Sequence, residues 1–149
     1  MQRKRLNPRD YLVFLLGRRE YSEHELRQKL KLRECSEEQI EDAVAFVKEL
    51  DLQSDERYAE SRARMDGRRK GNRIIRQKLA HQGISSERIE QELQGLPSEC
   101  ERAIEVAKRF EGKSLDLKAK GKVWRFLTYR GFSGDAIRAA LDHLEAPSA

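Results

Sequence analysis

Apolar residues recur at the spacing of an α-helix along most of the chain, and no long stretch alternates apolar and polar positions as a strand would. Residues 40–50 and 136–144 show this spacing most clearly, because each segment carries one apolar stripe with charged residues on its other faces. Of the three prolines, only Pro97 falls inside the body of the chain. The pattern predicts an all-α fold.

Serines mark where many of these helices begin. Residues 22–25, 36–39 and 98–101 have the form of a capping box, in which a serine and a later glutamate or glutamine bond each other's backbone N–H groups. Ser54, Ser86 and Ser133 stand before further helical patterns and are predicted caps as well. These signals predict nine short helices, at about residues 9–19, 22–32, 37–51, 55–67, 71–82, 86–94, 98–111, 116–130 and 133–145.

The spacing also contains a repeat. Arg27-Gln-Lys-Leu30 recurs as Arg76-Gln-Lys-Leu79 at an offset of 49, and an offset of 48 places Gly83-Ile-Ser85 over Gly131-Phe-Ser133. The chain therefore reads as three tandem three-helix units, at residues 1–53, 54–96 and 97–149. Units of this size have marginal cores, so we expect helix-turn-helix-like repeats that lean on one another in an elongated, possibly curved row. Three independent domains are the alternative.

Charge is distributed unevenly among the predicted helices. The chain has 31 Lys and Arg against 26 Asp and Glu, a net charge of +5. Residues 57–78 carry nine cationic against two acidic side chains, and residues 113–130 carry six against one, so they hold +7 and +5. The last helix expected in each unit is net negative instead, with −5 for residues 37–51, −2 for 86–94 and −2 for 133–145.

This distribution limits how the chain could meet nucleic acid. The last two helices of each unit resemble a helix-turn-helix, whose final helix enters the major groove among phosphates. Negative final helices would oppose such docking, so we do not expect sequence-specific reading of duplex DNA. The basic stretches predict a surface for phosphates or for an acidic protein groove, and a solvated helix face is the alternative. The predicted contact residues are Arg68, Arg69, Lys70, Arg73, Arg76, Lys78, Lys118, Lys120, Lys122, Arg125 and Arg130.

Three aromatic residues, Trp124, Tyr129 and Phe132, stand close to Arg125 and Arg130 and could stack on unpaired bases. Their spacing favours a place in the core instead, because Trp124 and Leu127 are three residues apart and Phe132 takes the repeat position of Ile84.

The sequence shows no recognisable catalytic or metal-binding pattern. Gly112-Lys-Ser114 lacks the upstream glycine and the strand of a phosphate-binding loop, and the three histidines have no ligand partners at metal-binding spacing. Cys35 and Cys100 lie far apart, which fits a reducing cytosol. No segment has the pattern of a secretory signal or of a membrane span. We therefore expect a cytoplasmic protein that is not an enzyme and uses no cofactor or metal.

Three segments resemble the RecX family of bacterial recombinase regulators: Tyr11–Leu30, Asp55-Glu-Arg-Tyr-Ala59 and Arg130-Gly-Phe-Ser133. The likeness covers nearly the whole chain in the right order, although Ser54 stands where the family usually has an acidic residue. The resemblance implies tandem three-helix repeats and a role in recombination, DNA repair and the SOS response. It also implies binding in the helical groove of the RecA filament on single-stranded DNA, which blocks filament growth.

Residues and resemblance together lead to one hypothesis: a monomeric, non-enzymatic regulator that contacts the RecA filament on single-stranded DNA through its middle and third units. Duplex DNA would be bound weakly if at all, and no membrane is involved. The alternative is a stand-alone DNA-binding module that contacts phosphates without a recombinase. An enzyme with an unfamiliar site is a third class, supported by no motif.

Overall fold

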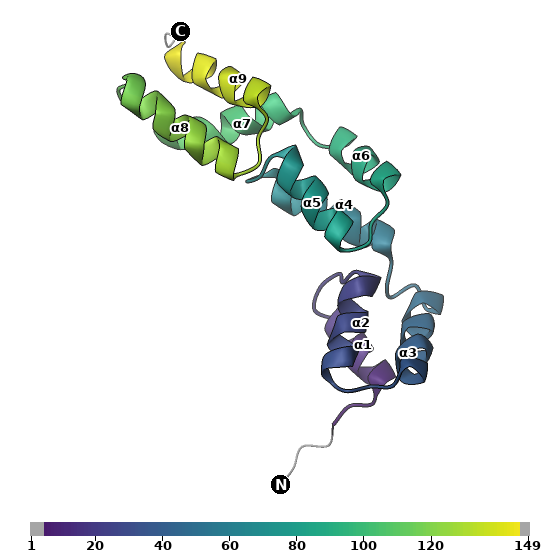
Figure 1. Ribbon diagram of the computed structural model, residues 1–149. Helices are drawn as coiled ribbons and strands as arrows, with labels where there is room; N and C mark the ends of the chain where they lie inside the picture. The colour runs from purple at the N-terminus through teal and green to yellow at the C-terminus, as the bar shows by residue number, and fades with distance from the viewer. Residues whose placement is uncertain (1–4, 147–149) are drawn as a thin grey trace. The chain divides into compact units, whose positions relative to one another are not determined.

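The computed structural model describes residues 5–146 (Figure 1). Within this range there are nine α-helices, one 3-10 helix (η1) and no strand, so the predicted fold class is confirmed. The elements are α1 (Pro8–Leu16), α2 (Glu23–Leu32), α3 (Glu37–Glu49), α4 (Asp55–Gly67), α5 (Asn72–His81), α6 (Ser86–Gln94), α7 (Glu99–Ala107), η1 (Lys108–Phe110), α8 (Leu117–Tyr129) and α9 (Gly134–Glu145). The helix expected over residues 98–111 thus ends at Ala107 and continues as η1.

The predicted caps are confirmed with one exception. Ser22, Ser36 and Ser98 form complete capping boxes, and Ser133 accepts from the backbone N–H of Ala136. The cap predicted at Ser86 is wrong, because Ser85 is the residue whose hydroxyl accepts from the Arg88 N–H, at 3.2 Å. The repeat register explains the difference, since Ser85 aligns with Ser36 and Ser133, which cap the equivalent helices.

The repeat is also visible in the backbone and in its ion pairs. Glu34, Gly83 and Gly131 occupy equivalent positions after the second helix of each unit, and all three have positive φ, at 62°, 78° and 91°. Arg27 pairs with Glu41 at 2.5 Å, and the equivalent pair of Arg76 and Glu90 lies at 2.6 Å. The shared turn and the shared ion pair indicate that the sequence repeat is a structural repeat.

By its packing, the chain divides into two compact units. Of the described residues, 5–61 and 82–84 belong to the first unit, and 62–81 and 85–146 belong to the second. The three repeat boundaries given above stay a prediction.

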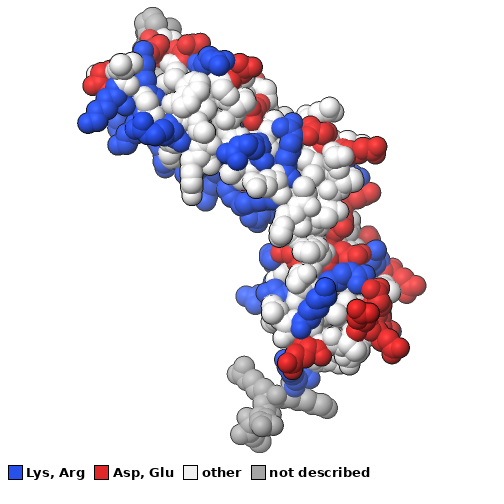
Figure 2. All heavy atoms as spheres, in the orientation of Figure 1, with Lys and Arg blue, Asp and Glu red and all other residues white. Residues whose placement is uncertain are grey.

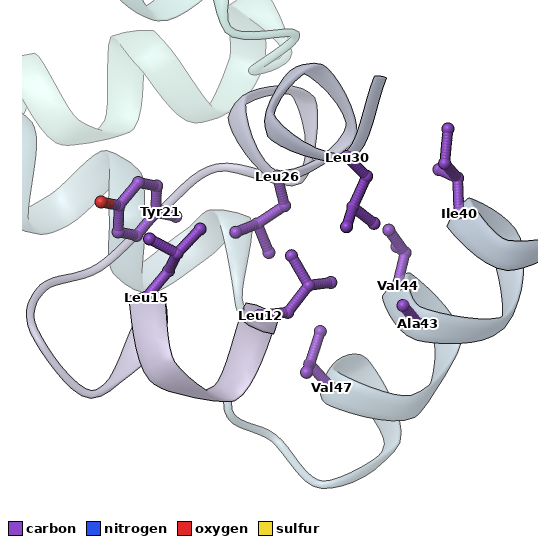
Figure 3. Packing of buried hydrophobic residues seen from close by; sticks show 9 residues of the cluster. All are labelled: Leu12, Leu15, Tyr21, Leu26, Leu30, Ile40, Ala43, Val44 and Val47. Carbon is purple, nitrogen blue, oxygen red and sulfur yellow. The ribbon is translucent and has the colours of Figure 1, made fainter. Parts of the chain in front are cut away.

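The core of the first unit is formed by one face from each of α1, α2 and α3 (Figure 3). Leu12 of α1, Leu26 and Leu30 of α2 and Val47 of α3 are inaccessible to solvent. Each of these residues lies on the apolar stripe of its helix, so burial of the three stripes stabilises the packing of the three helices.

The second unit contains α5 to α9 and the end of α4. Helices α7 and α9 pack closely because alanines face the contact: Ala103 and Ala107 from α7, and Ala136 and Ala140 from α9, are all fully buried. Val123 and Leu127 of α8 complete this core.

Two turns of the second unit meet backbone to backbone. One turn lies between α4 and α5, and the other lies between α8 and α9. The Gly71 N–H of the first donates to the Arg130 carbonyl of the second at 2.8 Å, and the Arg73 N–H donates to the Gly131 carbonyl at 3.3 Å. A Cβ on Gly71 would overlap the Gly131 carbonyl and the Phe132 nitrogen, and a Cβ on Gly131 would overlap Ile74. We call residues 70–73 and 130–133 the clasp.

Two charged residues of α7 bind the clasp through hydrogen bonds. The Glu99 carboxylate accepts from the backbone N–H of Asn72, at 2.7 Å, and from that of Ser133, at 3.2 Å. The buried Arg102 guanidinium donates to the Lys70 carbonyl at 2.8 Å and to the Asn72 side chain. Residues from α7 therefore bind both turns of the clasp to the same helix.

A glycine substitution tests the clasp. Gly71→Ala should lower the free energy of unfolding by about 2 kcal/mol or more, since the added methyl group meets backbone atoms that cannot turn away. Gly83→Ala is the control: unlike Gly71, Gly83 has a positive φ, but nothing lies within 4 Å of its Cβ, so the substitution should cost only the backbone strain of about 1 kcal/mol. Denaturant unfolding measures both, and a Gly71→Ala cost no larger than that of Gly83→Ala contradicts the close approach.

Candidate functional site

A groove of about 740 Å³ opens beside the clasp in the second unit. Six cations line it, and no Asp or Glu is among its described lining residues. Figure 2 shows Lys and Arg atoms gathered over α8 and beside α5, with acidic atoms over α6. The lining residues are Arg68, Arg69, Lys70, Ile74, Lys78, Val106, Arg109, Phe126, Tyr129 and Arg130, which we call the basic groove.

The clasp is what brings these cations together. Arg68 and Arg69 precede the first turn of the clasp, and Lys70 begins it. Arg130 begins the other turn, and its guanidinium donates to the Arg69 carbonyl at 3.3 Å. Arg109 reaches the groove from η1. Residues that are far apart in the sequence therefore form one cationic surface, which suits an anionic partner.

Two lysines of the groove, Lys70 and Lys78, lie near a single acid that is outside the lining. Asp66 is buried and pairs with Arg62 at 3.2 Å and with Lys70 at 3.8 Å. The Lys70 ammonium, followed by partial burial, lowers the pKa of Lys78 below its ordinary value, and the nearby Asp66 only partly offsets this. The cations on this side of the groove thus carry more positive charge than the neighbouring Asp66 carboxylate balances.

The groove also has an apolar floor. Ile74, Val106 and Phe126 are half-buried and line it. The guanidinium groups of Arg109 and Arg130 lie over the Phe126 ring, at 4.9 and 4.7 Å from its centroid. These contacts fix two long side chains at the groove while leaving their charges available.

Five of the predicted contact residues line the groove: Arg68, Arg69, Lys70, Lys78 and Arg130. Two others on α5 have partners within the unit. The Arg73 guanidinium donates to the Thr128 carbonyl at 3.0 Å, and Arg76 binds Glu90, whose pKa it lowers through that hydrogen bond. Arg76 therefore lies in the internal ion pair of the repeat and outside the groove.

The remaining predicted residues lie on α8. Lys120 pairs with Glu145 of α9. Lys118, Lys122 and Arg125 are exposed and, with Tyr129, follow one another at spacings of four, three and four residues. That spacing puts them on one face of the helix. We call this face the α8 stripe, and its last residue, Tyr129, lies in the groove.

Sequence reasoning missed Arg109 and was wrong about Tyr129. Arg109 lies between the two basic stretches, and its position depends on η1, which no pattern predicted. The core placement is confirmed for Phe132, which is buried, and for Trp124, which packs against the core of α7, α8 and α9. It is wrong for Tyr129, whose side chain is 83% exposed.

Other chemistry is not evident in the part of the chain that the structure describes. Residues 5–146 contain no group of His, Cys, Asp or Glu side chains able to hold a metal ion. None of the described helices is both long enough and apolar enough to cross a membrane.

The fold and the groove define an all-helical repeat protein with a groove lined by cations. Family models described as the first, second and third three-helix domains of RecX match residues 9–46, 54–93 and 98–141, respectively. The chain belongs to the RecX family. The prediction of three three-helix domains in tandem is thereby confirmed.

Relatives that match nearly the whole chain are named regulatory proteins. "Regulatory protein RecX" of Neisseria meningitidis serogroup C is 41% identical over 130 residues, which cover 87% of this chain and 85% of the relative. The protein of the same name from Actinobacillus pleuropneumoniae serotype 5b is 39% identical over 137 residues, which cover 89% of each.

Two solved structures share the fold. The crystal structure of RecX from Lactobacillus salivarius superposes with a TM-score of 0.76 over 93% of this chain and 94% of that one, at 23% identity. A crystal structure described as regulatory protein RecX gives a TM-score of 0.73 at 27% identity, and covers 91% of this chain and 70% of that one.

In the first unit, Asp55, which begins one of the segments that resemble the family, connects two helices. The Asp55 carboxylate accepts from the Glu23 N–H and from the Gln53 side chain, both at 2.9 Å, and so ties the start of α4 to the start of α2. Ser54, the departure from the family pattern, accepts from the Arg57 N–H at 3.2 Å and caps α4 as predicted.

The like-charge cluster gives a prediction about stability. Lys78→Gln should raise the free energy of unfolding at pH 7, because it removes a cation from a site where Lys70 disfavours it. Since the pKa of Lys78 is lowered on folding, the penalty is present at pH 7 and fades as the pH rises towards the ordinary lysine value of about 10.4. Denaturation at pH 7 and pH 10 measures the difference.

Lys29→Gln is the matched control, because Lys29 occupies the equivalent repeat position in α2. The gain in the free energy of unfolding should be seen for Lys78→Gln and not for Lys29→Gln, and it should be smaller at pH 10 than at pH 7. An equal gain for Lys29→Gln, or one that persists at pH 10, speaks against a strained cluster.

Proposed function

We propose that this chain is a non-enzymatic regulator that acts in the bacterial cytosol by binding the RecA filament on single-stranded DNA. The basic groove and the α8 stripe would contact the filament and inhibit its extension. The observation that carries the proposal is the convergence of six cations from three segments on one groove without a lining carboxylate. The names of the relatives support a regulatory role.

The chemistry of the groove suits such a partner. Four of its six cations are arginines, whose planar guanidinium groups bind phosphate or carboxylate through two parallel hydrogen bonds. A filament on single-stranded DNA offers both kinds of anion. Contact with several phosphates would make binding strongly dependent on salt.

Reading of duplex DNA by the final helices is not supported by the contacts of α6. Glu90 binds Arg76, and Glu92 binds Arg88 at 3.3 Å, so two of the three acids of this helix pair within the unit and its one cation, Arg88, is engaged by Glu92. Helix α6 therefore has no cationic face that could lie among phosphates.

Charge reversal in the groove tests the proposal. Arg68 and Arg69 are the best targets, because both are exposed and, among the described residues, neither pairs with a carboxylate as Arg76 does. Arg68→Glu with Arg69→Glu should abolish inhibition of recombinase ATPase on single-stranded DNA while leaving helicity intact. Lys29→Glu with Lys31→Glu changes the net charge equally on α2 and should leave inhibition unchanged.

The neutral pair Arg68→Gln with Arg69→Gln adds a quantitative readout. If each arginine meets one phosphate, the slope of log affinity against log salt on single-stranded DNA should fall by about 1.4. Inhibition that survives the reversal at matched ionic strength contradicts the groove as the contact surface. Salt-dependent DNA binding without any effect on recombinase would favour the stand-alone DNA-binding module instead.

A further inference from the structure

The groove contains one aromatic ring that nothing in the fold uses. Tyr129 lines the groove and is 83% exposed, and within residues 5–146 its ring and hydroxyl have no hydrogen-bond, ring or cation partner. Exposing a large aromatic side chain forfeits the stability that its burial would bring. Its neighbour Phe126, by contrast, is covered by two guanidinium groups and packs edge-on against Phe110 at 5.4 Å.

The surroundings of Tyr129 separate into a charged rim and an apolar floor. The cations of residues 68–70 and Arg130 form the rim, and Ile74 and Val106 belong to the floor. A nucleotide has the same two parts, an anionic phosphate and a flat base with an apolar face. Phosphate at the rim would place the base towards the ring and the floor.

The α8 stripe extends this arrangement along the helix. Lys118, Lys122 and Arg125 lead to Tyr129 on one face of α8, so three cations precede the ring over about 16 Å of helix. A line of cations that ends at an exposed aromatic ring is suited to a polyanion that carries unpaired bases.

This combination distinguishes single strands from duplexes. In a duplex both faces of each base are covered by stacked neighbours, and only phosphates and sugars reach a shallow protein groove. A duplex could satisfy the cationic rim but would leave Tyr129 and the apolar floor without a partner. A single strand can satisfy both, since its bases are free to turn out and stack.

We propose that Tyr129 is a base-stacking residue that makes the basic groove selective for single-stranded nucleic acid. This inference rests on the proposed function, because it assigns the groove to the DNA of the filament. It adds a specificity residue that charge alone does not supply.

Binding to a strand without bases isolates the stacking contribution. Wild type, Tyr129→Ala and Tyr129→Phe are compared on oligothymidylate, on an abasic strand of the same length and on a duplex. Tyr129→Ala should bind oligothymidylate about tenfold more weakly, as expected for the loss of one stacked base, and Tyr129→Phe should bind like wild type. Affinities for the abasic strand and the duplex should not change.

Phe14→Ala is the control, because Phe14 is an exposed aromatic residue on α1 and lies outside the groove. It should leave all three affinities unchanged. Unaltered oligothymidylate binding by Tyr129→Ala, or an equal loss on the abasic strand, overturns the stacking role. Those results leave the proposed function standing if the reversal of Arg68 and Arg69 still abolishes filament inhibition, so the two failures can be told apart.

Discussion

The second unit depends on a place where two turns of backbone lie in direct contact. Neither Gly71 nor Gly131 has room for a side chain, and each turn satisfies backbone hydrogen bonds of the other, at 2.8 and 3.3 Å. Glu99 and Arg102 of α7 stabilise the contact: the half-buried Glu99 carboxylate accepts from backbone N–H groups, and the buried Arg102 guanidinium donates to a backbone carbonyl. Because the contact is short and polar, it fixes the two turns with little freedom to slide. The basic groove is a consequence, since Arg69 and Arg130 are brought together only there.

The contact between the two turns also brings cations close together although they repel one another. Asp66 offsets part of the charge of Arg62 and Lys70, yet Lys78 still has a lowered pKa. A surface of this kind costs stability in the free protein, and an anionic ligand would remove the cost on binding. The ion pair of Arg76 with Glu90 differs from this cluster because it is part of the repeat. Its equivalent in the first unit, Arg27 with Glu41, joins neighbouring helices without forming a groove.

Much of the fold could be predicted because its signals are local. Serine caps and apolar stripes lie within a few residues of the helices that they determine, so the sequence places the helices well, and the cap predicted at Ser86 differs from the observed cap, Ser85, by one residue. The groove could be predicted only in part. Charge density pointed to residues 68–70 and Arg130, but it could not show that Arg76 is already paired. Arg109 and Tyr129 depend on η1 and on the clasp, which are properties of tertiary packing that a single sequence does not display.

The central claim is that the clasp exists in solution and organises the groove. Amide hydrogen exchange at Gly71 tests it most directly, because this N–H has its acceptor, the Arg130 carbonyl, in the other turn. The account predicts that the Gly71 amide exchanges far more slowly than an exposed turn amide, and more slowly still with a short single strand bound, since a ligand of the folded state suppresses opening. Exchange at the rate of an unprotected turn would contradict it.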